Sequence, residues 1–247
     1  MILVFDLDGT ICFDGVTISD GLLLALTNLS NAGNTLIFAS ARPIRDMLPL
    51  LSQFPNNFLI GGNGSIVRKK GKIEVVQPIE NDTFERLKKL IEQHGLDYLV
   101  DSDWNYSLCN RQDEKANIKS KIDALNLAEN VTLTDLSLAI KCNLLNLTDS
   151  SASLIKAELS NLNLEIVSHA HTASLDLTAK NINKYTTLKK YFPQADYIAF
   201  GNDANDTELL RHANLSVAVG HHPALDFADE HLIENEMIKL LQNPFCF

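Results

Sequence analysis

The chain has 247 residues, of which 45% are hydrophobic and 21% charged, with 21 Lys and Arg against 31 Asp and Glu. This balance excludes a disordered or fibrous protein, and the length is enough for one large domain or two small ones with a proper core. The formal net charge of −10 disfavours nucleic acid and anionic membrane surfaces as partners. An anionic ligand must therefore be held by a local site.

Four cysteines, at positions 12, 109, 142 and 246, are scattered without a CxxC pair or a His partner at metal spacing. This distribution predicts reduced thiols and no disulfide framework. The amino terminus reaches Asp6 without a basic segment, and no apolar run approaches the length of about 18 residues that suggests a membrane span. We expect a cytoplasmic protein that is a monomer or a weak homodimer.

In the first part of the chain, buried strands alternate with helical patterns, as a parallel sheet with crossover helices requires. Helices are predicted to begin near Ser19 and Pro43, and the second is predicted to run to about Phe54. The predicted strands are 2–5, 35–39 and 58–60, followed by a hairpin of 65–68 and 73–77.

The pattern changes from about residue 78 and indicates an inserted α+β unit. Its predicted elements are helices near 83–94 and 113–125 and strands at 98–99, 138–147 and 164–167. The buried-strand pattern then returns, with strands at 174–177, 197–200 and 216–219 and helices over 182–191 and 206–212.

These elements predict an α/β fold, with a Rossmann-like, doubly wound parallel sheet as the core. We place the core in residues 1–78 plus 176–247 and an α+β cap in residues 79–175. The cap is the more acidic part, with 9 basic and 15 acidic side chains.

The first candidate site residues are in Asp6-Leu7-Asp8-Gly9-Thr10, directly after the first predicted strand. The carboxyl ends of the strands in an open α/β sheet meet at the ligand crevice, so both aspartates are expected to enter it. Two carboxylates at short distance repel each other, which raises the pKa of one and favours a divalent cation between them. A DxD pair alone is usually a loop feature, but its place after a buried strand and before Gly-Thr favours a site.

Together with three later motifs, this segment resembles the haloacid dehalogenase superfamily of phosphotransferases. Ser40, after the strand over 35–39, matches the second motif, and Lys184 is similar to the lysine of the third. The segment from Gly201 to Asp206 resembles the fourth motif, GDxxND, with Asn202 in place of the first aspartate.

The length of the insert between the second and third motifs resembles the C2B cap of the Cof-type subfamily. Asn63-Gly64 before a hairpin fits the same subfamily.

The resemblance implies a Mg²⁺-dependent phosphatase. Asp6 is implied to be the nucleophile that becomes an aspartyl phosphate, and Asp8 to be the general acid and base. Ser40 and Lys184 are implied to bind the phosphoryl oxygens. The remaining implied positions are metal ligands at Asp6, Asp8, Asn202 and Asp206 and substrate contacts at Ser40, Ala41, Arg42, Asn63, Lys184 and Asn205.

Asn202 removes one formal negative charge from the implied metal site, so we expect weaker Mg²⁺ binding unless another residue supplies the charge. Asp206 is the better candidate, because Asp203 lies at a variable position of the motif. Arg42 is expected to contact either the phosphate or a cap residue. Structural roles are favoured over substrate contacts for His169, His171, His221 and His222, while packing and a sugar platform remain equal alternatives for Trp104 and Tyr106.

The function favoured by these features is hydrolysis of a small phosphomonoester, with a sugar phosphate as the expected substrate. The acidic cap fits a substrate with a neutral polar body better than a polyanion. One alternative is a phosphomutase or a dedicated glycosyl-phosphate phosphatase of the same superfamily. Another is a catalytically weakened binding or regulatory protein, which the substitution at Asn202 suggests.

Overall fold

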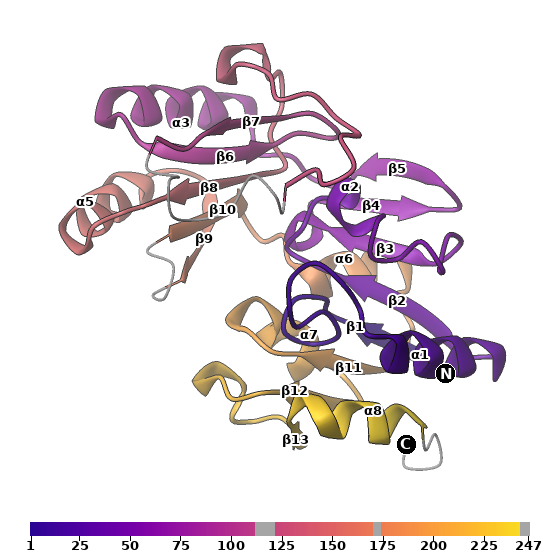
Figure 1. Cartoon of the computed structure of the whole chain (residues 1–247). Coiled ribbons are helices and arrows are strands. Elements are labelled where there is room, and N and C mark those ends of the chain that lie inside the picture. Colours follow the sequence, from indigo (N-terminus) through magenta and orange to yellow (C-terminus); the bar gives the residue numbers. More distant parts are fainter. Residues whose placement is uncertain (112–121, 170–173, 243–247) are drawn as a thin grey trace.

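The computed structural model describes residues 1–111, 122–169 and 174–242. These residues form two sheets with their own helices, and the second sheet lies above the first in Figure 1. No helix in the described ranges is long and apolar enough to cross a membrane. Positions 113–121 of a predicted helix, His171 and Cys246 lie outside the described residues.

The first sheet contains the amino-terminal strand at its centre. Within the described residues its order is β13, β12, β11, β1, β2, β3, β4, β5; the strands from β13 to β3 are parallel, and β4 and β5 are antiparallel. The strands are β1 Ile2–Phe5, β2 Thr35–Ala39, β3 Phe58–Gly61, β4 Ile66–Lys69, β5 Lys72–Val75, β11 Tyr197–Gly201, β12 Leu215–Val219 and β13 Glu230–Leu232.

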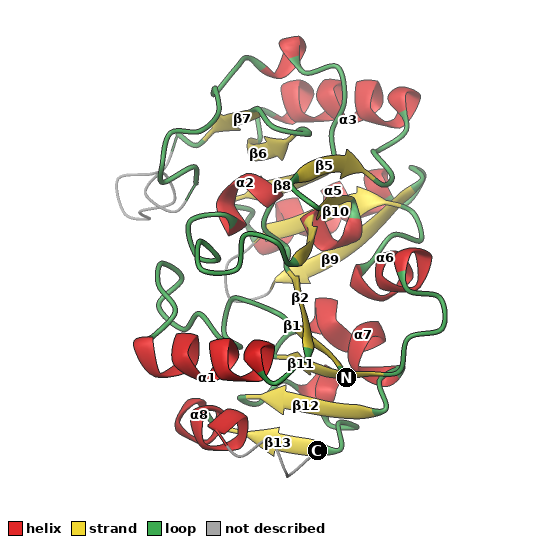
Figure 2. Ribbon diagram, turned by 90° about the vertical axis from the view of Figure 1, so that its right-hand side faces the viewer, coloured by secondary structure: helices red, strands yellow, loops and turns green. Residues whose placement is uncertain are grey.

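Helices cover both faces of this sheet, which confirms the doubly wound α/β core. Leu3 and Phe5 of β1 pack with α1 and α8, whereas Val4 packs on the other face with α6 and α7. Figure 2 shows these two pairs of helices on opposite sides of the strands. The helices are α1 Asp20–Asn31, α2 Ile44–Met47, α6 Lys184–Tyr191, α7 Thr207–Arg211 and α8 Glu234–Gln242.

The helix after Pro43 is shorter than predicted, because α2 ends at Met47 and residues 48–53 form turns. The side chains of Leu50, Leu51 and Phe54 are nevertheless buried in the apolar cluster of the first sheet. The apolar residues up to Phe54 are therefore buried as their spacing predicts, but they are not part of a helix.

The second sheet is antiparallel and has helices on one face. Among the described residues its order is β7, β6, β8, β10, β9. Helices α3 and α5 share an apolar cluster with these strands, and in Figure 1 they lie on the side away from the first sheet. The elements are α3 Asn81–His94, β6 Asp97–Asp101, β7 Tyr106–Cys109, β8 Lys141–Leu145, α5 Asp149–Leu159, β9 Leu164–His169 and β10 Ser174–Ala179.

The prediction that the strand over 174–177 returns to the core is wrong. This segment is part of β10, which pairs with β8 and β9 in the second sheet. Leu175 and Leu177 pack in the cluster with α3 and α5, while Asp176 between them lies on the other face. Such alternation is typical of a strand with one covered face. The chain therefore returns to the first sheet after Ala179 and not at residue 176.

Candidate active site

The predicted motifs meet at the carboxyl ends of the central strands of the first sheet. Strand β1 lies between β2 and β11, with β3 beyond one neighbour and β12 beyond the other. The strand order therefore switches direction at β1, which is where open α/β sheets form their ligand crevice. Asp6 follows β1 directly, Ser40 follows β2 and Asn202 follows β11.

Lys184, at the start of α6, joins two carboxylates of this crevice. Its Nζ atom lies 2.6 Å from Asp6 Oδ1 and 2.6 Å from Asp206 Oδ1. The side chains of Lys184 and Asp206 are 0% exposed, and that of Asp6 is 6% exposed. Buried charges require paired, hydrogen-bonded partners, and this arrangement supplies them. The structure thus brings together residues from the first, third and fourth motifs.

The cluster of Asp6, Lys184 and Asp206 contains more negative than positive charge when all three groups are ionised. Burial is the largest cause that raises the pKa of Asp6 to about 7, followed by repulsion from Asp206, while Lys184 opposes both. Burial lowers the pKa of Lys184, but attraction to Asp206 and Asp6 outweighs it and holds this pKa above its ordinary value. The site is therefore short of positive charge next to Asp6.

Thr10 connects Asp6 with Asn202. Its hydroxyl oxygen lies 3.0 Å from Asp6 Oδ2 and 3.4 Å from Asn202 Oδ1, and it donates to these oxygens. Gly9 has a φ of +78°, and a Cβ atom at this position would lie only 2.1 Å from Asn202 Nδ2. The glycine of the first motif therefore allows the Asn202 amide to approach the loop after β1. Our sequence analysis predicts no role for the Thr10 side chain. Its place in the DxDGT motif could have indicated such a role.

Asp206 organises the turn after β11. Its Oδ2 atom accepts hydrogen bonds from the backbone N–H groups of Asn202 at 3.0 Å and Asp203 at 3.3 Å, while Oδ1 binds Lys184. A Cβ atom at Gly201 would lie 2.6 Å from the Asp206 side chain, so glycine is needed for this close approach. Both carboxylate oxygens of Asp206 are thus bonded within the chain.

His222 supports the same turn. Its Nδ1 atom accepts a hydrogen bond from the Ala224 backbone N–H at 3.2 Å, which leaves the ring proton on Nε2. Nε2 lies 3.3 Å from Asp203 Oδ1. His221 is largely exposed and lies 3.9 Å from Asp226 Oδ1. The contacts of His222 agree with the structural interpretation of this residue.

Asn63 links the second motif to the fourth. Its backbone N–H donates to the Ser40 carbonyl at 3.0 Å, and its side-chain Oδ1 accepts from Asn205 Nδ2 at 2.9 Å. The Ser40 hydroxyl oxygen accepts from the Arg42 backbone N–H at 3.1 Å. Asn63 has a φ of 55°, a left-handed conformation that asparagine tolerates well. The predicted contact residues Ser40, Asn63 and Asn205 therefore form one connected set.

Arg42 binds Asp8 instead of a cap residue. Its Nε lies 2.7 Å from Asp8 Oδ2 and its Nη2 lies 2.5 Å from Asp8 Oδ1, which is a bidentate pair. Nη2 also donates to the Gly15 carbonyl at 2.7 Å. The Asp8 side chain is half-exposed. Our expectation for Arg42 named the phosphate or the cap and missed this partner.

Trp104 and Tyr106 lie where the two sheets meet. The Trp104 backbone carbonyl accepts a hydrogen bond from Arg45 Nη1 at 2.8 Å, and the Arg45 guanidinium lies 4.6 Å from the centre of the Tyr106 ring. The Trp104 ring donates from Nε1 to the Leu127 backbone carbonyl at 2.7 Å, so both aromatic side chains have contacts within the chain that support the packing alternative. His169 pairs through its backbone with Ser174 at the end of the β9–β10 ladder.

The oxygen atoms around Asp6 suit a magnesium ion. Mg²⁺ prefers carboxylate and carbonyl oxygens and retains several waters, so it needs few protein ligands. Asp6 Oδ2 and Asn202 Oδ1 both adjoin the Thr10 hydroxyl, and the surplus negative charge beside Lys184 favours a cation. The described residues contain no group of three His, Cys, Asp or Glu side chains arranged to hold a metal. The fit therefore depends on Asp6 together with amide and backbone oxygens.

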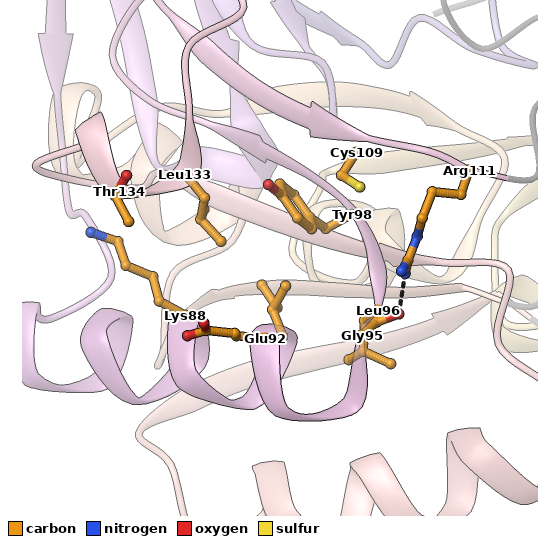
Figure 3. A pocket seen from close by; sticks show the side chains of 10 residues that line it. Lys88, Glu92, Gly95, Leu96, Tyr98, Cys109, Arg111, Leu133 and Thr134 are labelled. Atoms are coloured by element: carbon orange, nitrogen blue, oxygen red, sulfur yellow. Dashed lines mark hydrogen bonds between the residues drawn. The ribbon is translucent and has the colours of Figure 1, made fainter.

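A pocket also lies in the part of the chain that forms the second sheet (Figure 3). It has a volume of about 310 Å³, and its lining includes Lys88, Glu92 and Arg111. Arg111 Nε binds Asp97 at 2.9 Å, and its guanidinium also donates to the Gly95 carbonyl. The described lining residues include none from the four motifs, so this pocket is separate from the candidate active site.

The strand order and the charged residues at the strand ends define a Rossmann-like α/β core that carries an inserted antiparallel sheet. The chain belongs to the family of haloacid dehalogenase-like hydrolases, whose sequence model matches residues 3–230. This membership confirms the family resemblance predicted from the four motifs.

Similar proteins agree with this assignment. The chain is 25% identical over 242 residues to 5-amino-6-(5-phospho-D-ribitylamino)uracil phosphatase YitU of Bacillus subtilis strain 168, with 89% of this chain and 86% of the relative covered. The solved structure of the subclass IIB sugar phosphatase BT4131 matches with a TM-score of 0.79 and 22% identity, covering 100% of this chain and 99% of that one. A haloacid dehalogenase-like hydrolase from Bacteroides thetaiotaomicron matches with a TM-score of 0.82 and 20% identity, covering 99% of both chains. These two structures support the fold, including the inserted sheet.

Proposed function

We propose that this protein is a Mg²⁺-dependent phosphatase that hydrolyses small phosphomonoesters through an aspartyl phosphate on Asp6. The observation that carries the proposal is the environment of Asp6. Its carboxylate is buried at the end of β1, with Lys184 2.6 Å from Oδ1 and Thr10 3.0 Å from Oδ2. These contacts orient the carboxylate for in-line attack on a phosphoryl group.

In the first step, an Asp6 carboxylate oxygen forms a bond to phosphorus while the bond from phosphorus to the substrate alcohol breaks. Asp8 gives its proton to the departing alcohol oxygen. Both Asp8 oxygens accept hydrogen bonds from Arg42 in the structure. The proton transfer therefore requires Asp8 to exchange part of this contact for the leaving oxygen.

In the second step, water attacks the phosphorus of the aspartyl phosphate and gives its proton to Asp8. The bond from phosphorus to the Asp6 oxygen breaks, which releases inorganic phosphate and restores the Asp6 carboxylate. Asp8 thus returns to its protonated form, and the cycle balances.

The other motif residues hold the phosphoryl oxygens and the cation. Lys184 supplies a fixed ammonium beside Asp6, and the Ser40 hydroxyl supplies a donor from the loop after β2. Asp6, Asn202 and the Asp8 backbone carbonyl would hold Mg²⁺, which would supply positive charge beside the phosphoryl group. Ala41, Arg42, Asn63 and Asn205 remain proposed substrate contacts.

The proposed substrate is a sugar phosphate or a related phosphorylated metabolite. The acidic character of the cap supports a substrate whose body is neutral and polar, because further anionic groups would be repelled. The relatives named above include a phosphatase of a phosphoribityl compound and a sugar phosphatase. We also propose a cytoplasmic location, in keeping with the expected reduced cysteines.

A phosphate-release assay tests this function. A panel of phosphorylated metabolites is incubated with and without Mg²⁺, beside an Asp6→Asn variant that keeps the size of the side chain. We expect release from at least one monoester, dependent on Mg²⁺, and a loss of about 1,000-fold or more in the variant. Equal activity in the variant would contradict Asp6 as the nucleophile. Phosphate that moves to a second hydroxyl of the sugar without being released would favour a mutase.

A further inference from the structure

The second sheet turns a polar face toward the first sheet. On β8, Leu144 packs in the apolar cluster with α3 and α5, so Lys141 and Asn143 lie on the opposite face. The register places Asp101 of β6 opposite Lys141. It also places Asp176 of β10 opposite Asn143. Neighbouring strands therefore form what we call the polar row: Asp101, Lys141, Asn143 and Asp176.

The polar row contacts the first sheet beside the proposed phosphate site. Lys141 Nζ donates a hydrogen bond to the Ala41 backbone carbonyl at 3.1 Å. Ala41 lies between Ser40 and Arg42, which belong to the set of proposed substrate contacts. A phosphomonoester bound there would extend its alcohol part toward the second sheet at this row.

Asn143 presents a buried hydrogen-bond acceptor in the polar row. Within the described residues, its Oδ1 atom is buried and has no hydrogen-bond partner. Buried polar atoms are nearly always paired, so this acceptor lacks a donor that a ligand or a water molecule would supply.

The neighbours of Asn143 determine the orientation of its amide. Asn143 Nδ2 donates to Asp176 Oδ1. Because an ionised carboxylate only accepts hydrogen bonds, the amide cannot turn over and remain paired. Asp176 is held in turn by Lys141, whose Nζ lies 3.0 Å from its Oδ2. The series of contacts from the Ala41 carbonyl through Lys141 and Asp176 thus fixes the Asn143 amide. Its Oδ1 atom is left as the free hydrogen-bond acceptor.

We propose that Asn143 is a specificity-determining residue that accepts a hydrogen bond from a hydroxyl group on the alcohol part of the substrate, with Lys141 and Asp176 as its positioning residues. This inference rests on the proposed phosphatase function. The row selects for hydroxyl groups, because Asn143 Oδ1 requires a donor. It selects against a carboxylate at the same place, because an ionised carboxylate has no hydrogen to donate to Asn143 Oδ1.

The test compares two substrates in an Asn143→Leu variant. Glucose 6-phosphate carries hydroxyl donors on its alcohol part, and p-nitrophenyl phosphate carries none. We expect the ratio of kcat/KM for glucose 6-phosphate to that for p-nitrophenyl phosphate to fall about tenfold, mainly through KM for the sugar phosphate. A Lys141→Met variant should lower the same ratio, and Lys141→Arg should restore part of it. Asn161→Leu, at an exposed turn after α5, should leave the ratio unchanged.

A purely structural role for Asn143 would lower kcat/KM for both substrates alike and leave their ratio unchanged, and that result would overturn the inference. The binding of glucose 6-phosphate is a second measurement that needs no turnover. In an Asp6→Asn background, Asn143→Leu should weaken this binding about tenfold. Unchanged binding would also overturn the inference. Absence of phosphate release from every substrate by the unaltered enzyme would instead contradict the proposed function, and the binding measurement would still decide the role of Asn143.

Discussion

Lys184 and Arg45 are both buried cations, but they lie in different parts of the molecule. Lys184 is paired with Asp6 and Asp206, which both follow strands of the first sheet. Arg45 lies between the sheets, 2.9 Å from Asp46 on its own helix and 2.9 Å from Asp101 at the end of β6. The first cluster is held within the first sheet and its covering helix. The second joins the two sheets and so contributes to the way they are docked.

The largest effect is expected at Lys184. A Lys184→Met variant keeps most of the length of the side chain but leaves two buried carboxylates without their cation, which should lower the free energy of unfolding by about 3–5 kcal/mol. Phosphate release should fall by about 100-fold or more, because the ammonium beside Asp6 is lost. Urea denaturation and the phosphate-release assay measure the two effects. A variant of normal stability would show that the cluster does not depend on its cation.

Arg45 should affect stability more than chemistry. Arg45→Met should lower the free energy of unfolding by about 3 kcal/mol, because Asp46 and Asp101 lose their shared partner. The loss of phosphate release should be smaller than for Lys184→Met, since Arg45 does not contact Asp6. The exposed Arg86→Met is the matched control, with an expected change within about 0.5 kcal/mol. Equal losses of activity in the Lys184 and Arg45 variants would contradict the prediction that only the Lys184 cluster acts directly on phosphate release.

The burial of Asp6, together with repulsion from Asp206, predicts a pH effect in metal-free protein. The pKa of Asp6 is raised from 3.8 to about 7, so this group binds its proton more tightly in the folded state. Its contribution to stability is therefore complete below pH 4 and is lost as the pH rises through 7.

Denaturation in EDTA between pH 4 and 8 measures this contribution as the difference between the unaltered protein and Asp6→Asn. Carboxylates with a lowered pKa, such as Asp97 and Asp229, make stability fall as the pH falls, and they do so in both proteins. Their contribution cancels when the stability of one protein is subtracted from that of the other. A difference that does not change with pH would contradict the raised pKa.

The smallest expected effect concerns the charge missing at Asn202. An Asn202→Asp variant adds a carboxylate beside the Asp6 site, which should tighten Mg²⁺ binding about tenfold and lower the stability of the metal-free protein. Titration calorimetry with Mg²⁺ measures the affinity, and the exposed Asn161→Asp serves as the control. Binding no tighter than that of the unaltered protein would show that the missing charge at position 202 does not limit the affinity.

Most of the core was predictable because its signals are local. Short apolar runs that end in Asp6, Ser40 or Asn202 indicate buried parallel strands with polar residues at their carboxyl ends. The structure confirms the doubly wound sheet and brings Asp6, Lys184 and Asp206 together. The residue at which α2 ends and the sheet to which β10 belongs were not predictable in this way. The first depends on how the following apolar residues are buried, and the second depends on strand pairing.

Contacts between distant segments were also beyond local patterns. Nothing near Arg42 indicates that Asp8 is its partner, and nothing near Lys141 indicates the Ala41 carbonyl. Each of these contacts depends on a loop placed by a different strand. The same holds for Thr10, which meets Asn202 only because β1 and β11 are neighbours.

The amino-acid order alone determined which strands are apolar enough to be buried and which chemical groups follow them, because hydrophobic patterning and short motifs are properties of neighbouring residues. Only the tertiary structure decided the partner of each charge, the sheet to which β10 belongs and the orphaned acceptor of Asn143. The reason is that ion pairs and strand pairing join residues that are far apart along the chain. Their geometry exists only once both sheets have formed and docked.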